Sequence, residues 1–297
     1  MEINELINNE LIFNEKENFT AIIGSNPSKG ARSPLLWNYT FNKNNSKTKM
    51  HCFDVSEKNL SKLILCLKEN VNFLGGAIAV PYKEKVFDEL NSFISKDSLN
   101  IGAVNCLYRD KDKNLIGTNT DGEAALLSFK EKFGEIRNEK ILILGLGGAG
   151  KAVSSYFNNL KEHSNQLFIS GRSQSAEIFC NKLNCNFIKW DLFQNNIDSF
   201  DVIINCTSLG SGKMINISPI DERLVKKIKK TAKLFDIIYD PSPSKLLKIS
   251  SLCNLQILDG KRMNLLQASL AYDYCIKQNF RKHNTFDTMS ELYNKLN

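Results

Sequence analysis

The chain has 297 residues, more than a single hydrophobic core usually serves, so two domains are expected. With 42% hydrophobic and 24% charged residues it has the composition of an ordinary folded protein, which excludes global disorder. The net charge of +7 arises from scattered lysines, which either form a solvated surface or attract anionic ligands. No nucleic-acid-binding motif accompanies them, so nucleic acid is not an expected partner.

Short apolar runs alternate with helical patterns almost throughout the chain. The predicted strands cover residues 20–24, 50–55, 75–80, 103–109, 140–145, 166–171, 186–190, 201–206, 234–239 and 255–260. Helical stretches lie between them, as at residues 59–70, where leucine and isoleucine recur at three- and four-residue spacing. Strands that alternate with helices are typical of parallel βαβ units, so the sequence predicts an α/β architecture.

The C-terminal part of the chain has a different pattern. From about Lys261 it predicts two helices, at residues 261–280 and 285–296. A helical tail that follows an α/β domain often packs back on an earlier domain. We therefore expect a discontinuous first domain, formed by residues 1–120 and 261–297, and a second domain formed by residues 121–260.

The segment "KILILGLGGAGKAVSSYF" is the strongest local signal in the sequence. A buried strand runs into a glycine-rich turn and then into an amphipathic helix. The residues expected to bind a cofactor in this turn are Gly145, Gly147, Gly148, Ala149 and Gly150. Glycines let the backbone approach a pyrophosphate, whose oxygens bind the free N–H groups of the helix N-terminus. A bare G-x-G-x-x-G also occurs by chance, and the flanking strands and helix are what favour dinucleotide binding.

The end of the next strand distinguishes between two cofactors. Enzymes that prefer NAD place an Asp or Glu there, against the ribose hydroxyls. Here Arg172 stands at about that position, Ser173 follows it, and the first carboxylate is Glu177. An arginine pairs with a 2′-phosphate and a serine adds a hydrogen bond, so NADP (NADPH) is the expected cofactor. The alternative is that Arg172 is an ordinary surface residue.

Cysteine and histidine usage bears on the compartment and on metal binding. The eight cysteines form no Cys-x-x-Cys pair and no metal-ligand spacing, and the three histidines show no mutual spacing, so no metal is expected. Free cysteines in apolar runs are typical of a reducing compartment. The N-terminus is too acidic for a signal peptide, and no apolar run reaches the ~18 residues of a membrane span. We expect a cytoplasmic protein without a membrane partner.

Eight segments occur in the order found in the shikimate/quinate dehydrogenase family, which the chain resembles from about residue 20 to residue 280. They are "SNPSKGARSP", "VPYKEKV", "GAVNCLYR", "GTNTDGEAALLSF", "ILGLGGAGKA", "DVIINCTSLG", "LFDIIYDPSPSKLL" and "DGKRMNLLQASLAYDYC". The resemblance implies an α/β substrate domain completed by the C-terminal helices. It also implies an inserted Rossmann-type cofactor domain, a doubly wound parallel sheet, and a cleft in which hydride is transferred.

The resemblance assigns a catalytic pair to Lys83, in "VPYKEKV", and Asp121, in "NTDG". The chemistry has a physical basis, because hydride reduction of a ketone creates an alkoxide that a nearby ammonium stabilises and protonates. A carboxylate beside the lysine orients it and tunes its pKa. Taken alone, Lys83 would be a surface lysine at a helix start. Its motif, together with that of Asp121, favours catalysis.

The same resemblance implies the other site residues. The expected substrate-binding residues are Ser33, Ala31, Ala79, Asn105, Tyr239 and Gln267. The expected cofactor-binding residues beyond the glycine turn are Arg172, Ser173, Asn205, Thr207, Ser208 and Gly260. Asn105 is similar to an asparagine that bonds a substrate hydroxyl, and Gln267 to a glutamine that reaches into the cleft. Tyr239 and Gly260 are similar to residues at the junction between cofactor and substrate.

The chain departs from the family pattern mainly on the substrate side. Position 31, where the family pattern has a serine, is alanine here. Positions 77 and 79, where it has an asparagine and a threonine, are also alanines. Each buried hydrogen-bond partner that is lost costs on the order of 1–3 kcal/mol of binding. Candidates to bind a substrate carboxylate instead are Ser28, Lys29, Arg32 and Arg262. On the cofactor side, Ala176 stands where a second cation would help to hold the 2′-phosphate.

The resemblance leaves three functions open. The first is NADPH-dependent reduction of 3-dehydroshikimate to shikimate, in the aromatic amino acid (chorismate) pathway. The second is a shikimate dehydrogenase-like paralogue with the same hydride chemistry on a different cyclic hydroxy acid or polyol, such as quinate. The third is a non-catalytic dinucleotide-binding regulator, which the retention of Lys83 and Asp121 disfavours. We expect a small-molecule substrate and a monomer or homodimer.

Overall fold

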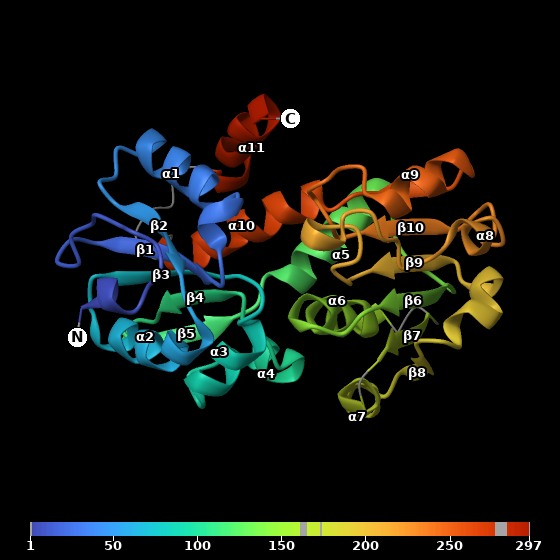
Figure 1. Ribbon diagram of the computed structural model, residues 1–297, viewed down its shortest axis with the longest axis horizontal. Coiled ribbons are helices and arrows are strands. Elements are labelled where there is room, and N and C mark those ends of the chain that lie inside the picture. Colours follow the sequence, from blue (N-terminus) through green and yellow to red (C-terminus); the bar gives the residue numbers. More distant parts are fainter. Residues whose placement is uncertain (1, 161–164, 173, 277–283, 297) are drawn as a thin grey trace. The chain divides into compact units, whose positions relative to one another are not determined.

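The computed structural model describes residues 2–160, 165–172, 174–276 and 284–296. The chain divides into two compact units, the first formed by Met1–Thr120 and Leu265–Asn297 and the second by Asp121–Asn264. Figure 1 shows both units in colours that follow the sequence. The assignment of substrate binding to the first unit and cofactor binding to the second stays a prediction.

The first unit is built on a mixed β-sheet with strand order β2-β1-β3-β4-β5 in the described residues. Its strands are β1 (Phe19–Gly24), β2 (Lys49–Asp54), β3 (Phe73–Ile78), β4 (Cys106–Arg109) and β5 (Leu115–Thr118). The predictions of the first four strands are confirmed, with shifted ends. Pairing in this sheet is mixed, in contrast to the parallel pairing of βαβ units, because β4 runs antiparallel to both β3 and β5.

The turn between β4 and β5 explains this difference. The Asp110 side chain accepts hydrogen bonds from the backbone N–H groups of Asp112 (2.9 Å) and Asn114 (2.8 Å). Such a tight turn joins antiparallel strands only, since parallel strands need a long crossover. β5 was not predicted because it is a four-residue strand with a glycine at its third position.

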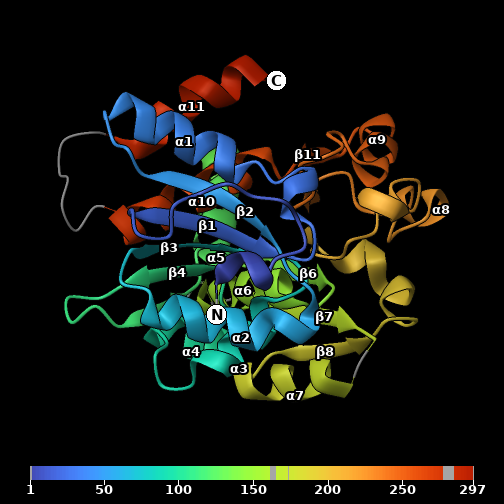
Figure 2. The ribbon, with the colours of Figure 1, turned by 60° about the vertical axis from the view of Figure 1, so that its left-hand side comes forward.

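Helices cover both faces of the first sheet (Figures 1 and 2). They are α1 (Ser33–Lys43), α2 (Glu57–Glu69), α3 (Lys83–Leu90), α4 (Lys96–Ile101), α10 (Lys261–Ile276), which enters this unit at Leu265, and α11 (Thr285–Leu296). On one face α2 and α3 share a core with Ile3, Leu6 and Ile7 of the N-terminal segment. On the other face α1, α10 and α11 share a second core. The two predicted C-terminal helices are thus confirmed where the structure describes them; residues 277–280 of the first lie outside the described residues.

The second unit contains a fully parallel sheet with strand order β11-β10-β9-β6-β7-β8 in the described residues. Its strands are β6 (Lys140–Leu144), β7 (Gln166–Gly171), β8 (Asn186–Lys189), β9 (Val202–Asn205), β10 (Lys233–Asp236) and β11 (Gln256–Leu258). All six were predicted. The order is that of a Rossmann fold: β7 and β8 are added on one side of β6, and β9, β10 and β11 on the other. The predicted α/β fold with a doubly wound sheet is confirmed.

The helices of the second unit lie on both faces of this sheet. They are α5 (Asp121–Phe133), α6 (Gly148–Asn158), α7 (Gln174–Leu183), α8 (Glu222–Val225) and α9 (Lys245–Leu252), with short 3-10 segments at Phe193–Ser199 and Gly212–Met214. α5 and α6 pack closely, since a Cβ on Gly122 would lie 2.4 Å from the carbonyl oxygen of Ala152. Beneath them the Phe129 ring lies 5.6 Å from that of Phe157. No helix in the described residues is both long and apolar enough to cross a bilayer.

Arg109 fixes the end of helix α2 to the sheet. Its guanidinium donates hydrogen bonds to backbone carbonyl oxygens at the end of the helix, at 2.6 Å to Leu67, 3.0 Å to Lys68 and 2.9 Å to Asn70. Carbonyls at a helix C-terminus lack partners within the helix and attract cations. Burial lowers the pKa of Arg109.

We predict that Arg109→Met lowers the free energy of unfolding by about 3 kcal/mol, because several carbonyl groups lose a charged partner. Urea denaturation of the variant and the wild type measures this difference. Arg137→Met, at an exposed arginine, is the control and should change stability by less than about 0.5 kcal/mol. Equal effects of the two substitutions would contradict the assignment.

Candidate active site

The glycine turn after β6 has the geometry that a pyrophosphate requires. Gly145 has a φ of +93°, which only glycine adopts without strain. A Cβ on Gly150 would lie 2.3 Å from the carbonyl oxygen of Gly145, so helix and turn approach too closely for any side chain. A Cβ on Gly147 would meet no atom within 4 Å, so space lies open at the N-terminus of α6. Gly148 and Ala149 begin that helix with free N–H groups. The turn therefore fits a dinucleotide.

Arg172 follows the last residue of β7 and is exposed. The adjacent strand brings a second cation to the same edge of the sheet, because β7 pairs in register with β8 and places Lys189 opposite Gly171. Ala176 is fully buried, and a Cβ on Gly171 would lie 2.9 Å from its Cβ. Sequence analysis missed Lys189, since only the strand register places it near Arg172. Ser173 lies outside the described residues.

A buried carboxylate organises the segment that follows β9. Asp236 is the last residue of β10 and accepts hydrogen bonds from Ser244 Oγ at 2.5 Å, Asn205 Nδ2 at 3.0 Å and the backbone N–H of Ile238 at 3.2 Å. Burial raises the pKa of Asp236 to about 6. Sequence analysis did not single out this residue, because its partners come from three separate segments.

Asn205, which is bonded to Asp236, also fixes the conformation of the loop of residues 206–209. Its side chain is fully buried, and its Oδ1 accepts hydrogen bonds from Thr207 N at 3.0 Å and Thr207 Oγ1 at 2.7 Å. Thr207 Oγ1 in turn accepts one from Leu209 N at 3.1 Å. Ser208, between them, is exposed. Asn205 therefore shapes the loop, while Thr207 and Ser208 form part of it.

Gly260 precedes α10 and packs against the segment that contains Tyr239. A Cβ on Gly260 would lie 1.9 Å from the carbonyl oxygen of Ile237, and its own N–H donates to the carbonyl of Ile238 at 3.0 Å. Tyr239 is half-buried next to this contact. The structure thus brings the segments of these two predicted site residues together within the second unit.

Asn105 is hydrogen-bonded to Thr120, the last residue of the first unit before the chain enters the second. Its side chain is buried; Oδ1 accepts a hydrogen bond from Thr120 N at 2.8 Å, and Nδ2 donates to Thr120 Oγ1 at 3.0 Å. Thr120 Oγ1 also donates to the carbonyl of Gln267 at 3.1 Å. Two predicted substrate-binding residues, Asn105 and Gln267, therefore meet at Thr120.

The predicted catalytic residues both begin helices, Lys83 at α3 and Asp121 at α5. The carbonyl of Lys83 accepts a hydrogen bond from Val104 N at 2.8 Å, so Lys83 is fastened to the residue before Asn105. Asp121 directly follows Thr120, which Asn105 fixes. Lys83 is half-buried and Asp121 is buried. The positions of both backbones therefore depend on the segment of Val104 and Asn105.

The loop of residues 25–32 leads from β1 to α1, whose first residue, Ser33, is buried. Ala77 belongs to the core beneath α1, and Ala31 and Ala79 pack against the same core. A Cβ on Gly24 would lie 2.9 Å from the Cβ of Ala79, so the loop leaves β1 beside this alanine. The three alanines noted in the sequence thus belong to one apolar region.

Most residues considered as carboxylate-binding alternatives are engaged elsewhere. Arg262 forms a bidentate ion pair with Glu131, at 2.6 Å and 2.9 Å. The Arg32 guanidinium lies 5.2 Å from the centre of the Tyr293 ring. Ser28 is bonded to Asp54 through its N–H and its hydroxyl. Lys29 is exposed in the same loop.

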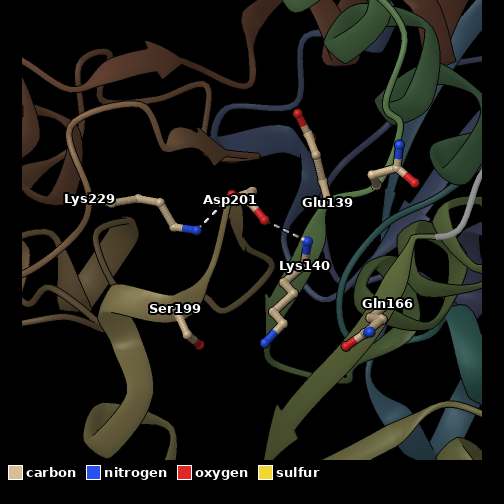
Figure 3. A pocket seen from close by; sticks show the side chains of 7 residues that line it. Glu139, Lys140, Gln166, Ser199, Asp201 and Lys229 are labelled. Atoms are coloured by element: carbon tan, nitrogen blue, oxygen red, sulfur yellow. Dashed lines mark hydrogen bonds and ion pairs between the residues drawn. The ribbon is translucent and has the colours of Figure 1, made fainter.

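A cavity of about 410 Å³ lies at the N-terminal ends of β6 and β7, whereas the glycine turn follows the C-terminal end of β6 (Figure 3). Its lining includes Lys140 and Gln166, the first residues of β6 and β7. Asp201 accepts hydrogen bonds from Lys229 Nζ at 2.6 Å and from the backbone N–H of Lys140 at 2.8 Å, so these lining residues of the cavity are bonded to one another. This cavity is therefore separate from the candidate site. Among the side chains that the structure describes, no three His, Cys, Asp or Glu residues are grouped as metal ligands.

Two family models match the chain. The model described as "Shikimate dehydrogenase substrate binding domain" matches residues 22–107. The model described as "Shikimate / quinate 5-dehydrogenase" matches residues 128–240. The first match lies within the first unit and the second within the second unit.

Curated relatives match over most of their length. The shikimate dehydrogenase (NADP(+)) of Methanocaldococcus jannaschii is 29% identical over 269 residues, which cover 88% of this chain and 92% of that protein. The enzyme of the same name from Methanococcus aeolicus is 31% identical and covers 88% of this chain and 93% of its own. That of Clostridium botulinum strain Hall is 32% identical, with coverages of 84% and 93%.

Solved structures agree with these matches. A shikimate dehydrogenase crystallised with NADP+ superposes with a TM-score of 0.80 at 26% identity, over 96% of this chain and 97% of that chain. Shikimate dehydrogenase 1 of Peptoclostridium difficile superposes with a TM-score of 0.78 at 28% identity, over 94% and 97%.

The raised pKa of Asp236 predicts a pH-dependent cost in stability. Its ordinary value is 3.8, so the folded protein binds this proton more tightly than the unfolded chain does. The carboxyl group therefore destabilises the fold as the pH rises from about 4 to about 6. Asp236→Asn cannot ionise, and its stability relative to the wild type should rise by roughly 3 kcal/mol between about pH 4 and pH 7.

Urea denaturation at several pH values measures this difference. Asp110→Asn is the control with opposite sign, because hydrogen bonds from Asn114 lower the pKa of Asp110. That variant should lose stability relative to the wild type as the pH rises. A pH-independent difference for Asp236→Asn would contradict the role of burial.

Proposed function

The chain belongs to the shikimate dehydrogenase family, and we propose that it catalyses the NADP-dependent interconversion of 3-dehydroshikimate and shikimate. The observation that carries this proposal is the match to relatives named shikimate dehydrogenase (NADP(+)) over 84–88% of this chain. The glycine turn supports it, because Gly145 and Gly150 permit a tight turn and the space at Gly147 is open to a pyrophosphate. The interpretations as a paralogue or as a regulator are not needed to explain these matches.

The reaction requires a hydride, a proton and a stabilised oxygen. When bound, NADPH supplies the hydride to the carbonyl carbon of the substrate. The ammonium group of Lys83 stabilises the negative charge that develops on the carbonyl oxygen and transfers a proton to it. Asp121 orients this ammonium. In the reverse direction Lys83 accepts the proton of the hydroxyl group.

On the substrate side, Asn105, Gln267 and Ser33 supply the polar contacts of the proposed site. Asn105 and Gln267 are positioned through Thr120, and Ser33 by its place at the start of α1. Ala31 and Ala79 supply apolar surface only. The hydroxyl of Tyr239 is the remaining proposed contact with the substrate. We therefore expect substrate binding to combine polar contacts with an apolar surface.

On the cofactor side, the N-terminus of α6 binds the pyrophosphate, and Arg172 with Lys189 binds the 2′-phosphate. Ser173 would add a hydrogen bond there. Thr207 and Ser208 form the loop beside the nicotinamide ribose, held by Asn205. Gly260 allows the close packing next to Tyr239.

The protein works in the cytoplasm in this proposal. The eight cysteines form no disulfide with one another in the described residues, which supports a reducing compartment. It acts on a small-molecule substrate, as a monomer or homodimer.

Steady-state assays with shikimate and quinate, each with NADP+ and NAD+, test the proposed activity. Turnover of quinate without turnover of shikimate would overturn the proposal.

Lys83→Ala should lower kcat by about 10²- to 10⁴-fold, because the proton donor is lost. The Kd for NADP+, measured by fluorescence titration, should change less than about twofold, since Lys83 lies outside the glycine turn. Lys85→Ala is the matched control, because Lys85 belongs to the same helix but pairs with Glu57. Retention of full turnover in Lys83→Ala would show that another group donates the proton.

Arg172→Ala should raise the KM for NADP+ by about 10- to 100-fold, because the 2′-phosphate loses a charged partner. The KM for NAD+, which lacks this phosphate, should stay within about twofold. Arg223→Ala, at an exposed arginine of α8, is the control. A parallel loss with both cofactors would assign Arg172 to the fold and not to cofactor choice.

A further inference from the structure

Asp54 holds the middle of the loop between β1 and α1. It is the last residue of β2, and it is 5% exposed. Its Oδ1 accepts a hydrogen bond from the backbone N–H of Ser28 at 2.9 Å, and its Oδ2 accepts one from Ser28 Oγ at 2.5 Å. Both carboxylate oxygens therefore bind one residue of the loop.

The N-terminal segment fixes Asp54 from the other side. β2 is an edge strand of the first sheet, and Asn8 and Asn9 occupy its outer hydrogen-bonding edge. Asn8 N donates to the carbonyl of Asp54 at 2.6 Å, and Asp54 N donates to Asn9 Oδ1 at 2.8 Å. Asn9 Nδ2 donates to the carbonyl of Cys52 at 3.0 Å. The end of β2 is thus held between the N-terminal segment and the loop.

The far end of the loop has a second attachment. The Arg32 guanidinium lies 5.2 Å from the Tyr293 ring of α11, within the range of a cation–π contact. Within the loop, Ala31 N donates to the carbonyl of Pro27 at 3.0 Å. The residues that lead into Ser33 are therefore fastened at both ends, at Ser28 and at Arg32.

A buried carboxylate is an expensive way to close a surface loop. Removing an ionised group from water costs several kcal/mol unless hydrogen bonds replace its hydration. Ser28 and Lys29 are exposed, and the bond between Ala31 and Pro27 already closes the turn. Asp54 is therefore not needed to close the turn. Its additional effect is to fix the position of the loop relative to β2.

We propose that Asp54 is a positioning residue for the substrate. Through Ser28 it holds the loop of residues 25–32 so that Ser33 meets the substrate. This inference rests on the proposed function, in which Ser33 contacts shikimate. Asp54 and Ser28 belong to the first unit, whereas the glycine turn belongs to the second, so the effect falls on shikimate and not on NADP+.

The test compares Asp54→Ala, Ser28→Ala, the double variant and Ser28→Thr in the full-length enzyme. Asp54→Ala should raise the KM for shikimate by about 10- to 100-fold, with the KM for NADP+ changed less than about twofold. Ser28→Ala should raise it by several-fold, and Ser28→Thr, which keeps the hydroxyl, should restore the wild-type value. The double variant should resemble Asp54→Ala, because Asp54→Ala already removes the hydrogen bond that Ser28→Ala removes.

Two matched controls lie elsewhere in the same unit. Asp110→Ala removes a turn carboxylate between β4 and β5, and Ser46→Ala removes the hydroxyl that accepts from Thr48 N before β2. Neither should change the KM for shikimate by more than about twofold. Equal increases in the controls, or equal increases for shikimate and NADP+ in Asp54→Ala, would overturn the proposal. If Asp54→Ala does not fold, the comparison of Ser28→Ala with Ser28→Thr decides it.

Amide hydrogen exchange of residues 25–32 separates this proposal from the proposed function. It is measured without substrate, and Asp54→Ala should speed exchange at Ser28 while exchange in β1 stays unchanged. Unchanged exchange at Ser28 would overturn the hold of Asp54 on the loop. Absence of shikimate turnover in the wild type would instead overturn the proposed function.

Discussion

The buried hydrogen bonds between Asn105 and Thr120 fix the point where the chain passes from the first unit to the second. Thr120 ends the N-terminal part of the first unit, and Asp121 begins α5. The carbonyl of Gln267, just after the chain returns at Leu265, accepts from the same threonine. Both passages of the chain are therefore tied to Thr120, which the buried side-chain amide of Asn105 holds in place. Because unpaired buried amides are costly, this arrangement leaves little freedom to the residues on either side.

In each unit, a buried aspartate at the end of a strand also holds a neighbouring segment by hydrogen bonds. Asp54 ends β2 and Asp236 ends β10, and each accepts a hydrogen bond of 2.5 Å from a serine hydroxyl of a neighbouring segment. The carboxyl ends of parallel strands are where α/β proteins place ligand-binding loops. A buried carboxylate at such an end can hold a loop that has few apolar contacts of its own. The two loops belong to the proposed substrate side and cofactor side.

How much the sequence predicts depends on how local each feature is. The glycine turn was predicted because Gly145, Gly147 and Gly150 act within six residues, and the structure accounts for each of them. Arg262 was considered as a ligand for carboxylate because its partner, Glu131, lies 131 residues away in the chain. Lys189 and Asp236 were missed for the same reason, since strand register and tertiary contacts place them. The relation of Ala31 to Ala79 likewise becomes visible only once α1 and β3 share a core.

The discontinuity of the first unit has a consequence for synthesis on the ribosome. Trp37 Nε1 donates a hydrogen bond to the carbonyl of Ala268, 231 residues later, and its ring packs against Tyr272. The second unit is contiguous and has all its strands once residue 264 has emerged. In the first unit the core under α2 and α3 needs only residues before 121. The core that contains Trp37 and Phe41 stays incomplete until α10 and α11 leave the exit tunnel. The second unit therefore has its whole sequence available before the first does, and the apolar surface around Trp37 is the part of the nascent chain that stays exposed longest.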